Sequence, residues 1–387
     1  MAGAEAAVAP GEEQRASPLE LFFDLVFVFA ITQVTALVAD DLTWAGFGRG
    51  MLVLALLWWA WSAYVWVVNA QDPDATHVRL LVFASMVLTF LVALTVPHAF
   101  GGDSATFAWC YAGVRLIHLV LYADASRRGR ASWGAIAGFA VTTVVGMALL
   151  VVGAEVEGDA RLVLWTVALA LDVAGPWLTR RRLRGLQTVG VTHFAERFAL
   201  FVIICLGESI VALGVGAQDV PIDRYVALGV ATGIGISAAL WWTYFDYVAG
   251  ASEERLAEAD DAVSLARDAY SYAHVVLVAG IIVLAVGLKK AIGHEADPLA
   301  DAPRLALCGG VALYLAGHLA FRLRMIGTPS AEKAAAAVAV LLLYLVTGDV
   351  DAWVTSALVL AVLALLVARE NVVERSLRDR LHHRTVA

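Results

Sequence analysis

The chain has 387 residues, of which 61% are hydrophobic and only 16% charged, and its mean hydropathy is +0.77. Soluble globular domains have about 45–50% apolar and about 25% charged residues, so this composition excludes a soluble domain, a disordered chain and a disulfide-stapled secreted module, and predicts an integral membrane protein. The net charge of −8 disfavours a nucleic-acid partner, and the three cysteines lack metal-binding spacing.

Twelve apolar runs are candidates for membrane-spanning helices, each of which needs about 20 mostly apolar residues. They are 18–39, 47–68, 78–97, 104–124, 132–153, 160–178, 194–217, 224–248, 269–290, 303–325, 331–347 and 350–370. The third, sixth and eleventh runs are the shortest. Since no strand alternation recurs along the chain, the sequence predicts an all-α integral membrane protein with about twelve transmembrane helices.

The distribution of basic residues predicts that both termini are cytoplasmic. The two tails and the even-numbered loops hold nineteen Arg and Lys residues, against six in the odd-numbered loops. The resulting layout has a tail at 1–17, a six-helix half at 18–178, a basic linker at 179–193, a second six-helix half at 194–370 and a basic tail at 371–387. That last tail is either an amphipathic helix beside anionic lipid or a solvated end. The charged segment 249–268 is predicted to be a helical cytoplasmic linker.

An internal repeat is indicated by three marks in the same order. Residues 20–37 align without a gap on residues 196–213, a WW-x4-Y pattern begins at Trp58 and again at Trp241, and His118 is echoed by His318. Two halves of six helices each would share one membrane orientation, as in parallel-repeat transporters. The alternative is a chance alignment of apolar helices.

Ionisable side chains inside the spans are the main functional candidates, because each costs a few kcal/mol at membrane depth on insertion scales. Asp24 shares a helical face with Glu20, Phe27 and Ile31. The other charged candidates are Arg115, Arg197 and Glu208. We expect Arg115 to be the counter-ion of Asp24 or of Glu208. These groups form either a structural ion-pair network or a proton- or ion-conducting path.

Three carboxylates are assigned to the periphery of this system. Glu20 and Glu196 lie near the predicted cytoplasmic surface and are either part of the network or simply hydrated helix ends, and Asp172 stands alone in the sixth span.

His118 and His318 are either packing residues or groups that titrate near neutral pH. The dense tryptophans that follow Trp58 and Trp241 form either an interfacial belt or a stacking surface for a substrate.

Two sequence blocks carry a family resemblance. RASPLELFFDLVFVFAITQVTAL at 15–37 and HFAERFALFVIICLGESIVALG at 193–214 resemble the bacterial low temperature requirement protein A (LtrA) family, and the WW-x4-Y region between them also fits. The resemblance covers essentially the whole chain. It implies a multi-pass protein of the bacterial plasma (inner) membrane that is associated with growth in the cold.

A more distant resemblance suggests a mechanism. Residues 22–32, FFDLVFVFAIT, are similar to the F-S-D-x-V-F-A-I-A-I-T motif of the lysosomal two-repeat potassium channels and their six-helix bacterial relatives, in which the first helix of each repeat lines the pore. The likeness implies that Asp24, Phe27 and Ile31 face a conduction path. The chain departs from the motif at Phe23, which replaces the serine, and Leu200 stands where the second half would repeat Asp24.

The leading hypothesis is therefore a channel or transporter for an ion or small solute, with its path between the first and seventh spans. The candidate path residues are Asp24, Phe27, Ile31, Arg115, His118, Arg197, Glu208 and His318. The alternatives are a lipid-modifying enzyme that uses Asp24, Glu208 and His118 as acid and base groups, and a non-transporting scaffold. No P-loop, HExxH, GxSxG or GxGxxG motif occurs, and no cofactor or metal is predicted. The expected partners are membrane lipids and the solute, with a homo-oligomer as an open alternative.

Overall fold

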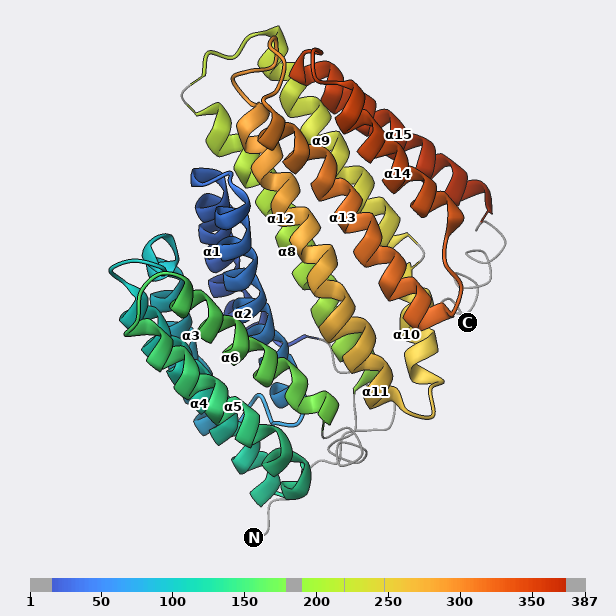
Figure 1. The fold of residues 1–387 in the computed structure, drawn as a ribbon. Helices are drawn as coiled ribbons and strands as arrows, with labels where there is room; N and C mark the ends of the chain where they lie inside the picture. The colour runs from blue at the N-terminus through green and yellow to red at the C-terminus, as the bar shows by residue number, and fades with distance from the viewer. Residues whose placement is uncertain (1–15, 179–189, 219, 247, 374–387) are drawn as a thin grey trace.

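The computed structural model describes residues 16–178, 190–218, 220–246 and 248–373, and within these residues the fold is all-helical, with no strand (Figure 1). The elements are α1 (Pro18–Asp40), α2 (Trp44–Val68), α3 (Thr76–Thr95), η1 (Val96–His98), α4 (Ser104–Arg127), α5 (Trp133–Ala154), α6 (Asp159–Leu178), α8 (Val191–Ala217), α9 (Arg224–Phe245), α10 (Val248–Ala257), α11 (Ala262–Ala266), η2 (Arg267–Ala273), α12 (His274–Ala291), α13 (Asp301–Ile326), α14 (Ala331–Val346) and α15 (Ala352–Val373). The basic linker and tail predicted from the sequence fall largely at 179–189 and 374–387, outside the described residues.

Each of the twelve predicted spans coincides with a helix, so the all-α membrane fold is confirmed. In the described part of the chain, eleven helical segments are long and apolar enough to cross a membrane. The helix that falls short is α14, which has 16 residues. The predicted linker 249–268 is helical in α10 and α11, and it is followed by a π-helix, η2, that the sequence did not indicate.

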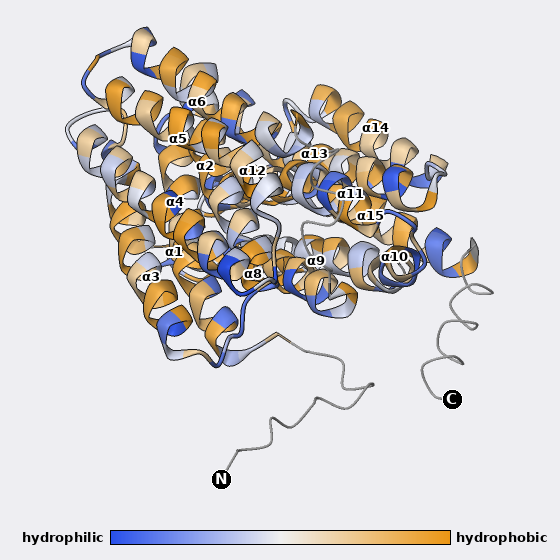
Figure 2. Cartoon of the chain, turned by 90° about the horizontal axis from the view of Figure 1, so that it is seen from below, coloured by the Kyte–Doolittle hydropathy of each residue, from blue (hydrophilic) through white to orange (hydrophobic). Residues whose placement is uncertain are grey.

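Hydrophobic residues occur along all the long helices (Figure 2), and large apolar side chains are exposed on the outside of the bundle as well as buried in its core. Leu80, Val141 and Leu345 are each more than 60% exposed on different helices. Burying such side chains is the main driving force for folding in water, so a surface of this kind is stable only when lipid surrounds it. The chain is a multi-pass membrane protein. The cytoplasmic placement of the termini and the symmetry of the two halves stay predictions.

The helices α1 and α2 lie between two groups, with α3–α6 on one side and α8–α15 on the other (Figure 1). The most deeply buried spans are α2 and the segment that ends with α12. A capping box fixes the start of α1: the Ser17 hydroxyl accepts from the Glu20 N–H, and the Glu20 carboxylate accepts from the Ser17 N–H at 2.8 Å. This cap holds the Glu20 carboxylate at the first turn, beside α8.

The helix pair with the most extensive contact is α12 with α13, and glycines allow the approach. A Cβ added at Gly310 would collide with the backbone of Leu284, and one added at Gly280 would collide with the backbone of Tyr314. Backbone atoms of a packed helix cannot move aside as a flexible side chain can. This pair therefore follows the small-residue packing that is common between membrane helices.

We expect Gly310→Ala to lower the unfolding free energy by about 1–3 kcal/mol or more, because overpacking forces the backbones of α12 and α13 apart. Gly309→Ala is the matched control. Its Cβ would meet only the side chain of Leu305, at 3.5 Å, and alanine is the better helix former. Thermal unfolding of the purified variants, followed by tryptophan fluorescence, checks this expectation; equal melting temperatures would contradict it.

Candidate functional site

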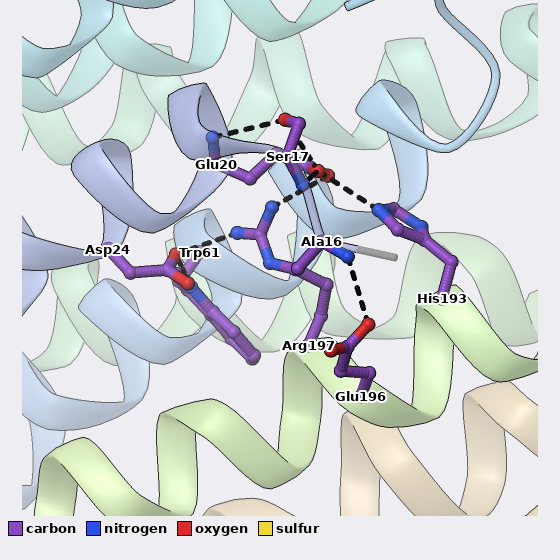
Figure 3. A network of polar contacts seen from close by, with 8 residues as sticks. All are labelled: Ala16, Ser17, Glu20, Asp24, Trp61, His193, Glu196 and Arg197. Carbon is purple, nitrogen blue, oxygen red and sulfur yellow. Dashed lines mark hydrogen bonds and ion pairs between the residues drawn. The ribbon is translucent and has the colours of Figure 1, made fainter. Parts of the chain in front are cut away.

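A buried arginine joins α1 to α8. Arg197 Nη1 lies 2.7 Å from Glu20 Oε1, and Arg197 Nη2 lies 2.7 Å from Asp24 Oδ1 (Figure 3). The exposed fractions are 1% for Arg197, 3% for Glu20 and 0% for Asp24. Because Glu20 and Asp24 are one helical turn apart on one face of α1, a single planar guanidinium can bind both carboxylates.

Neighbouring side chains complete this cluster (Figure 3). The Trp61 indole N–H of α2 donates to Asp24 Oδ1 at 2.8 Å, and His193 Nε2 lies 3.0 Å from Glu20 Oε2. Asp24 Oδ2 accepts no hydrogen bond from the described residues, although it is buried. Glu196 is half-buried. Its carboxylate accepts a hydrogen bond from the N–H of Ala16, two residues before α1 begins, at 2.9 Å. Three helices therefore meet at one set of charges, which we call the Arg197 cluster: Glu20, Asp24, Trp61, His193 and Arg197.

The sequence missed two members of the cluster. His193 lies one turn before Arg197, so their spacing of four along the helix was an available signal. For Trp61 the sequence held no signal, because nothing in a run of three tryptophans tells which one faces a carboxylate. Of the two alternatives left open for Glu20, the structure favours membership of the network over a hydrated helix end, because Glu20 is buried and pairs with Arg197.

The expected partner of Arg115 is also wrong. Arg115 pairs with Asp172 of α6, with Nη2 at 2.8 Å from Oδ2, and not with Asp24 or Glu208. Thr143 of α5 donates to Asp172 Oδ1 at 2.6 Å. Asp172, which the sequence assigned to the periphery, is thus the counter-ion of Arg115. The two charges lie on helices whose order in space the sequence does not reveal, since α4 and α6 are separated in the chain by α5.

A third polar position lies farther along the α1–α8 interface. The Thr32 hydroxyl of α1 donates to Glu208 Oε2 of α8 at 2.5 Å, and Glu208 is 3% exposed. In the described part of the chain no Lys or Arg lies within ion-pair distance of Glu208, and the half-exposed Lys289 of α12 attracts it from farther away. Arg197 and Glu208 are eleven residues apart, or about 16 Å along the helix.

Apolar side chains separate the two ends of this interface. Phe27 and Ile31 lie on α1 between Asp24 and Thr32, and Phe201 lies on α8 between Arg197 and Glu208; all three are at most 2% exposed. The Phe201 ring packs against Trp61, with the ring centroids 3.9 Å apart. The interface is therefore polar at both ends and apolar in the middle.

The tryptophans of the two WW-x4-Y patterns differ in environment. Trp58 and Trp61 are core residues of α2, which excludes an interfacial belt for these two, whereas Trp241 and Trp242 are each 44% exposed. Both candidate histidines are buried among aromatic rings. His118 packs beside Tyr122 and Phe139, and His318 Nε2 lies 2.9 Å from the Thr243 carbonyl oxygen.

The three residues that the lipid-modifying enzyme hypothesis would use as acid and base groups do not lie together in the structure. Asp24 belongs to the Arg197 cluster, Glu208 lies farther along α8, and His118 lies on α4 beside the Arg115–Asp172 pair. Among the described residues, no group of three or more His, Cys, Asp or Glu side chains could hold a metal ion.

We expect Asp172→Asn to lower the unfolding free energy by about 3–5 kcal/mol, because it leaves the buried Arg115 guanidinium without a counter-ion. Asp74→Asn is the control. It breaks the exposed Arg79–Asp74 pair, and surface pairs contribute about 0–1 kcal/mol. Thermal unfolding of the two purified variants measures the difference, and a mild Asp172→Asn phenotype would show that the pair is not structurally essential.

The comparisons with known proteins identify the family. Residues 15–368 match the family described as Bacterial low temperature requirement A protein (LtrA). The chain is 30% identical over 315 residues to an uncharacterized protein of Rhizobium meliloti (strain 1021), covering 80% of this chain and 77% of that protein. None of the solved structures matches it significantly. With a match over nearly its whole length, and with Glu20, Asp24, His193 and Arg197 of the Arg197 cluster lying in the two sequence blocks that resemble this family, the chain belongs to the bacterial low temperature requirement A family.

Proposed function

We propose that this membrane protein moves protons or small cations along the interface between α1 and α8. The observation that carries the proposal is an excess of buried negative charge. Glu20, Asp24 and Glu208 are three buried carboxylates, and Arg197 is the one buried guanidinium in contact with them among the described residues; His193 beside Glu20 adds a positive charge only when it is protonated. A buried charge is costly unless it is compensated, so this interface has an affinity for protons or cations.

The titratable groups at each end suit this role. At one end, Asp24 Oδ2 has no hydrogen-bond donor within the described residues and is free to accept a proton. At the other end, Glu208 is held by a hydroxyl group, which satisfies one oxygen without cancelling its charge. Arg197 compensates one of the two carboxylates at the first end, whereas Glu208 has no Lys or Arg within ion-pair distance among the described residues, so negative charge is left over at both ends.

The apolar stretch between the two ends acts as a closed gate. Asp24 and Thr32 are eight residues apart, or about 12 Å along α1, and the side chains of Phe27, Ile31 and Phe201 fill that distance. Ions cross such a constriction only after it is hydrated. We infer that the structure corresponds to a closed state, and that transport requires α1 and α8 to separate at these three residues.

The direct test is flux into proteoliposomes that contain the purified protein, measured across a panel of protons, alkali cations and chloride. We expect flux of protons or of one or more cations, and none of chloride. Protein-free liposomes give the background. Flux of chloride alone, or no flux of any tested ion, would defeat the proposal.

We expect Asp24→Asn to abolish this flux while the protein stays folded. Asparagine keeps the shape and its oxygen still accepts from Trp61 and Arg197, and Arg197 keeps Glu20 as its counter-ion. Thermal stability and flux are measured on the same preparation. An early-melting variant would indicate a structural role for Asp24, and a stable variant with normal flux would remove it from the path.

We expect Glu208→Gln to reduce flux at least tenfold, because the amide retains a hydrogen bond to Thr32 but carries no charge. Glu196→Gln is the matched control. Glu196 lies on the same helix but is only half-buried, and its contact with the Ala16 N–H before α1 lies outside the stretch from Asp24 to Glu208, so its loss should leave flux within about twofold of the unmodified protein. Equal effects of the two substitutions would contradict a specific role for Glu208.

A further inference from the structure

We propose that a cavity outside the α1–α8 interface binds a small carboxylate with an apolar body. The cavity lies between α2, α4, α5, α6 and the π-helix η2, and its volume is about 70 Å³. A water molecule needs about 10–15 Å³ by this measure, so there is room for several waters or for a small organic group. Its walls are rich in rings, contributed by Trp59, Trp66, Tyr122 and Phe139.

The polar atoms of the cavity wall require an acceptor. Arg115 Nε, Arg115 Nη1 and Trp59 Nε1 are buried and have no hydrogen-bond partner among the described residues. All three are N–H groups that can only donate. An unpaired buried donor costs about 1–3 kcal/mol, so an occupant that carries acceptor oxygens would be favoured at this position. His118 Nδ1 is also unpaired there and can take either role, depending on its tautomer.

The charges of the wall favour an anion. Arg115 contacts Asp172 through Nη2 alone, so Nε and Nη1 can bind a ligand without breaking that pair. Arg267 of η2 is the second guanidinium in the wall, and Asp172 is the one carboxylate among the lining residues. The neighbouring Asp268 is shared between Arg267 and Arg324, so the basic groups around the cavity outnumber the acidic ones.

The site is distinct from the proposed transport path, and the inference does not rest on transport. Trp58 and Trp61 of α2 contact Phe198 and Phe201 of α8. Trp59 of the same helix lines the cavity instead and stacks on Tyr272. Two kinds of molecule could supply such a carboxylate. One is a soluble aromatic acid, and the other is a fatty acid from the bilayer whose carboxylate group enters the cavity. Benzoate and laurate represent the two.

Binding is tested on the full-length protein in lipid nanodiscs by equilibrium dialysis of radiolabelled benzoate or laurate, with empty nanodiscs as the blank. We expect saturable binding of at least one acid. Arg115→Lys keeps a cation for Asp172 but removes the two unpaired donors, so the affinity should fall at least about tenfold. Should that variant fail to fold, Trp59→Phe keeps the ring and removes one donor, and its affinity should fall about five- to tenfold with an unchanged melting temperature.

Trp165→Phe is the control variant. Its indole donates to the Leu150 carbonyl oxygen at 3.0 Å, away from the cavity, so its affinity should be unchanged. Binding of laurate alone supports a bilayer source, and binding of benzoate supports a soluble one. The proposal is overturned if neither acid binds saturably, if benzyl alcohol binds as tightly as benzoate, or if Trp59→Phe binds as tightly as the unmodified protein.

Discussion

The structure depends on one buried guanidinium. Arg197 has almost no access to water, so it is stable at membrane depth only with counter-ions and hydrogen bonds in fixed geometry. It finds them in two carboxylates one turn apart on α1. This arrangement fixes the register of α8 against α1, because sliding either helix by a turn would separate the pairs. Asp24 extends the same constraint to α2 through Trp61.

Arg115 and Arg197, two of the four buried arginines among the described residues, differ in their balance of charge. Arg115 is matched by the single carboxylate of Asp172, so that pair is neutral and leaves several donors unpaired. Arg197 faces two carboxylates, and Glu208 adds a third farther along α8. An excess of donors attracts acceptors, and an excess of negative charge attracts protons or cations. This physical difference is why we assign a carboxylate-binding site to the surroundings of Arg115, and the movement of protons or cations to the interface that contains Arg197.

The sequence predicted the helices well and their contacts poorly. Apolar runs reveal membrane helices because every backbone polar group must be satisfied within the span, and all twelve runs are helical. Which buried charges would pair was harder to predict. Asp24 and Arg197 were both identified as candidates, but Arg115 was given the wrong counter-ion, because pairing depends on which helices are neighbours. The π-helix η2 was not predicted. The cavity beside it was not predicted either, because the residues that line it come from helices far apart in the chain.

The short helix α14 has a consequence for the surrounding lipid. Its 16 residues extend about 24 Å, whereas the hydrocarbon core of a bilayer is about 30 Å thick. Leu345 and Val346 nevertheless point outward and are each about 70% exposed, so lipid tails must contact this face. The buried Lys333 at the other end pairs with Glu370 of α15, which holds the helix in place. Hydrophobic mismatch of this kind is relieved by local thinning of the bilayer, at a cost of fractions of a kcal/mol per Å. The protein should therefore prefer thinner membrane regions on the side formed by α14 and α15.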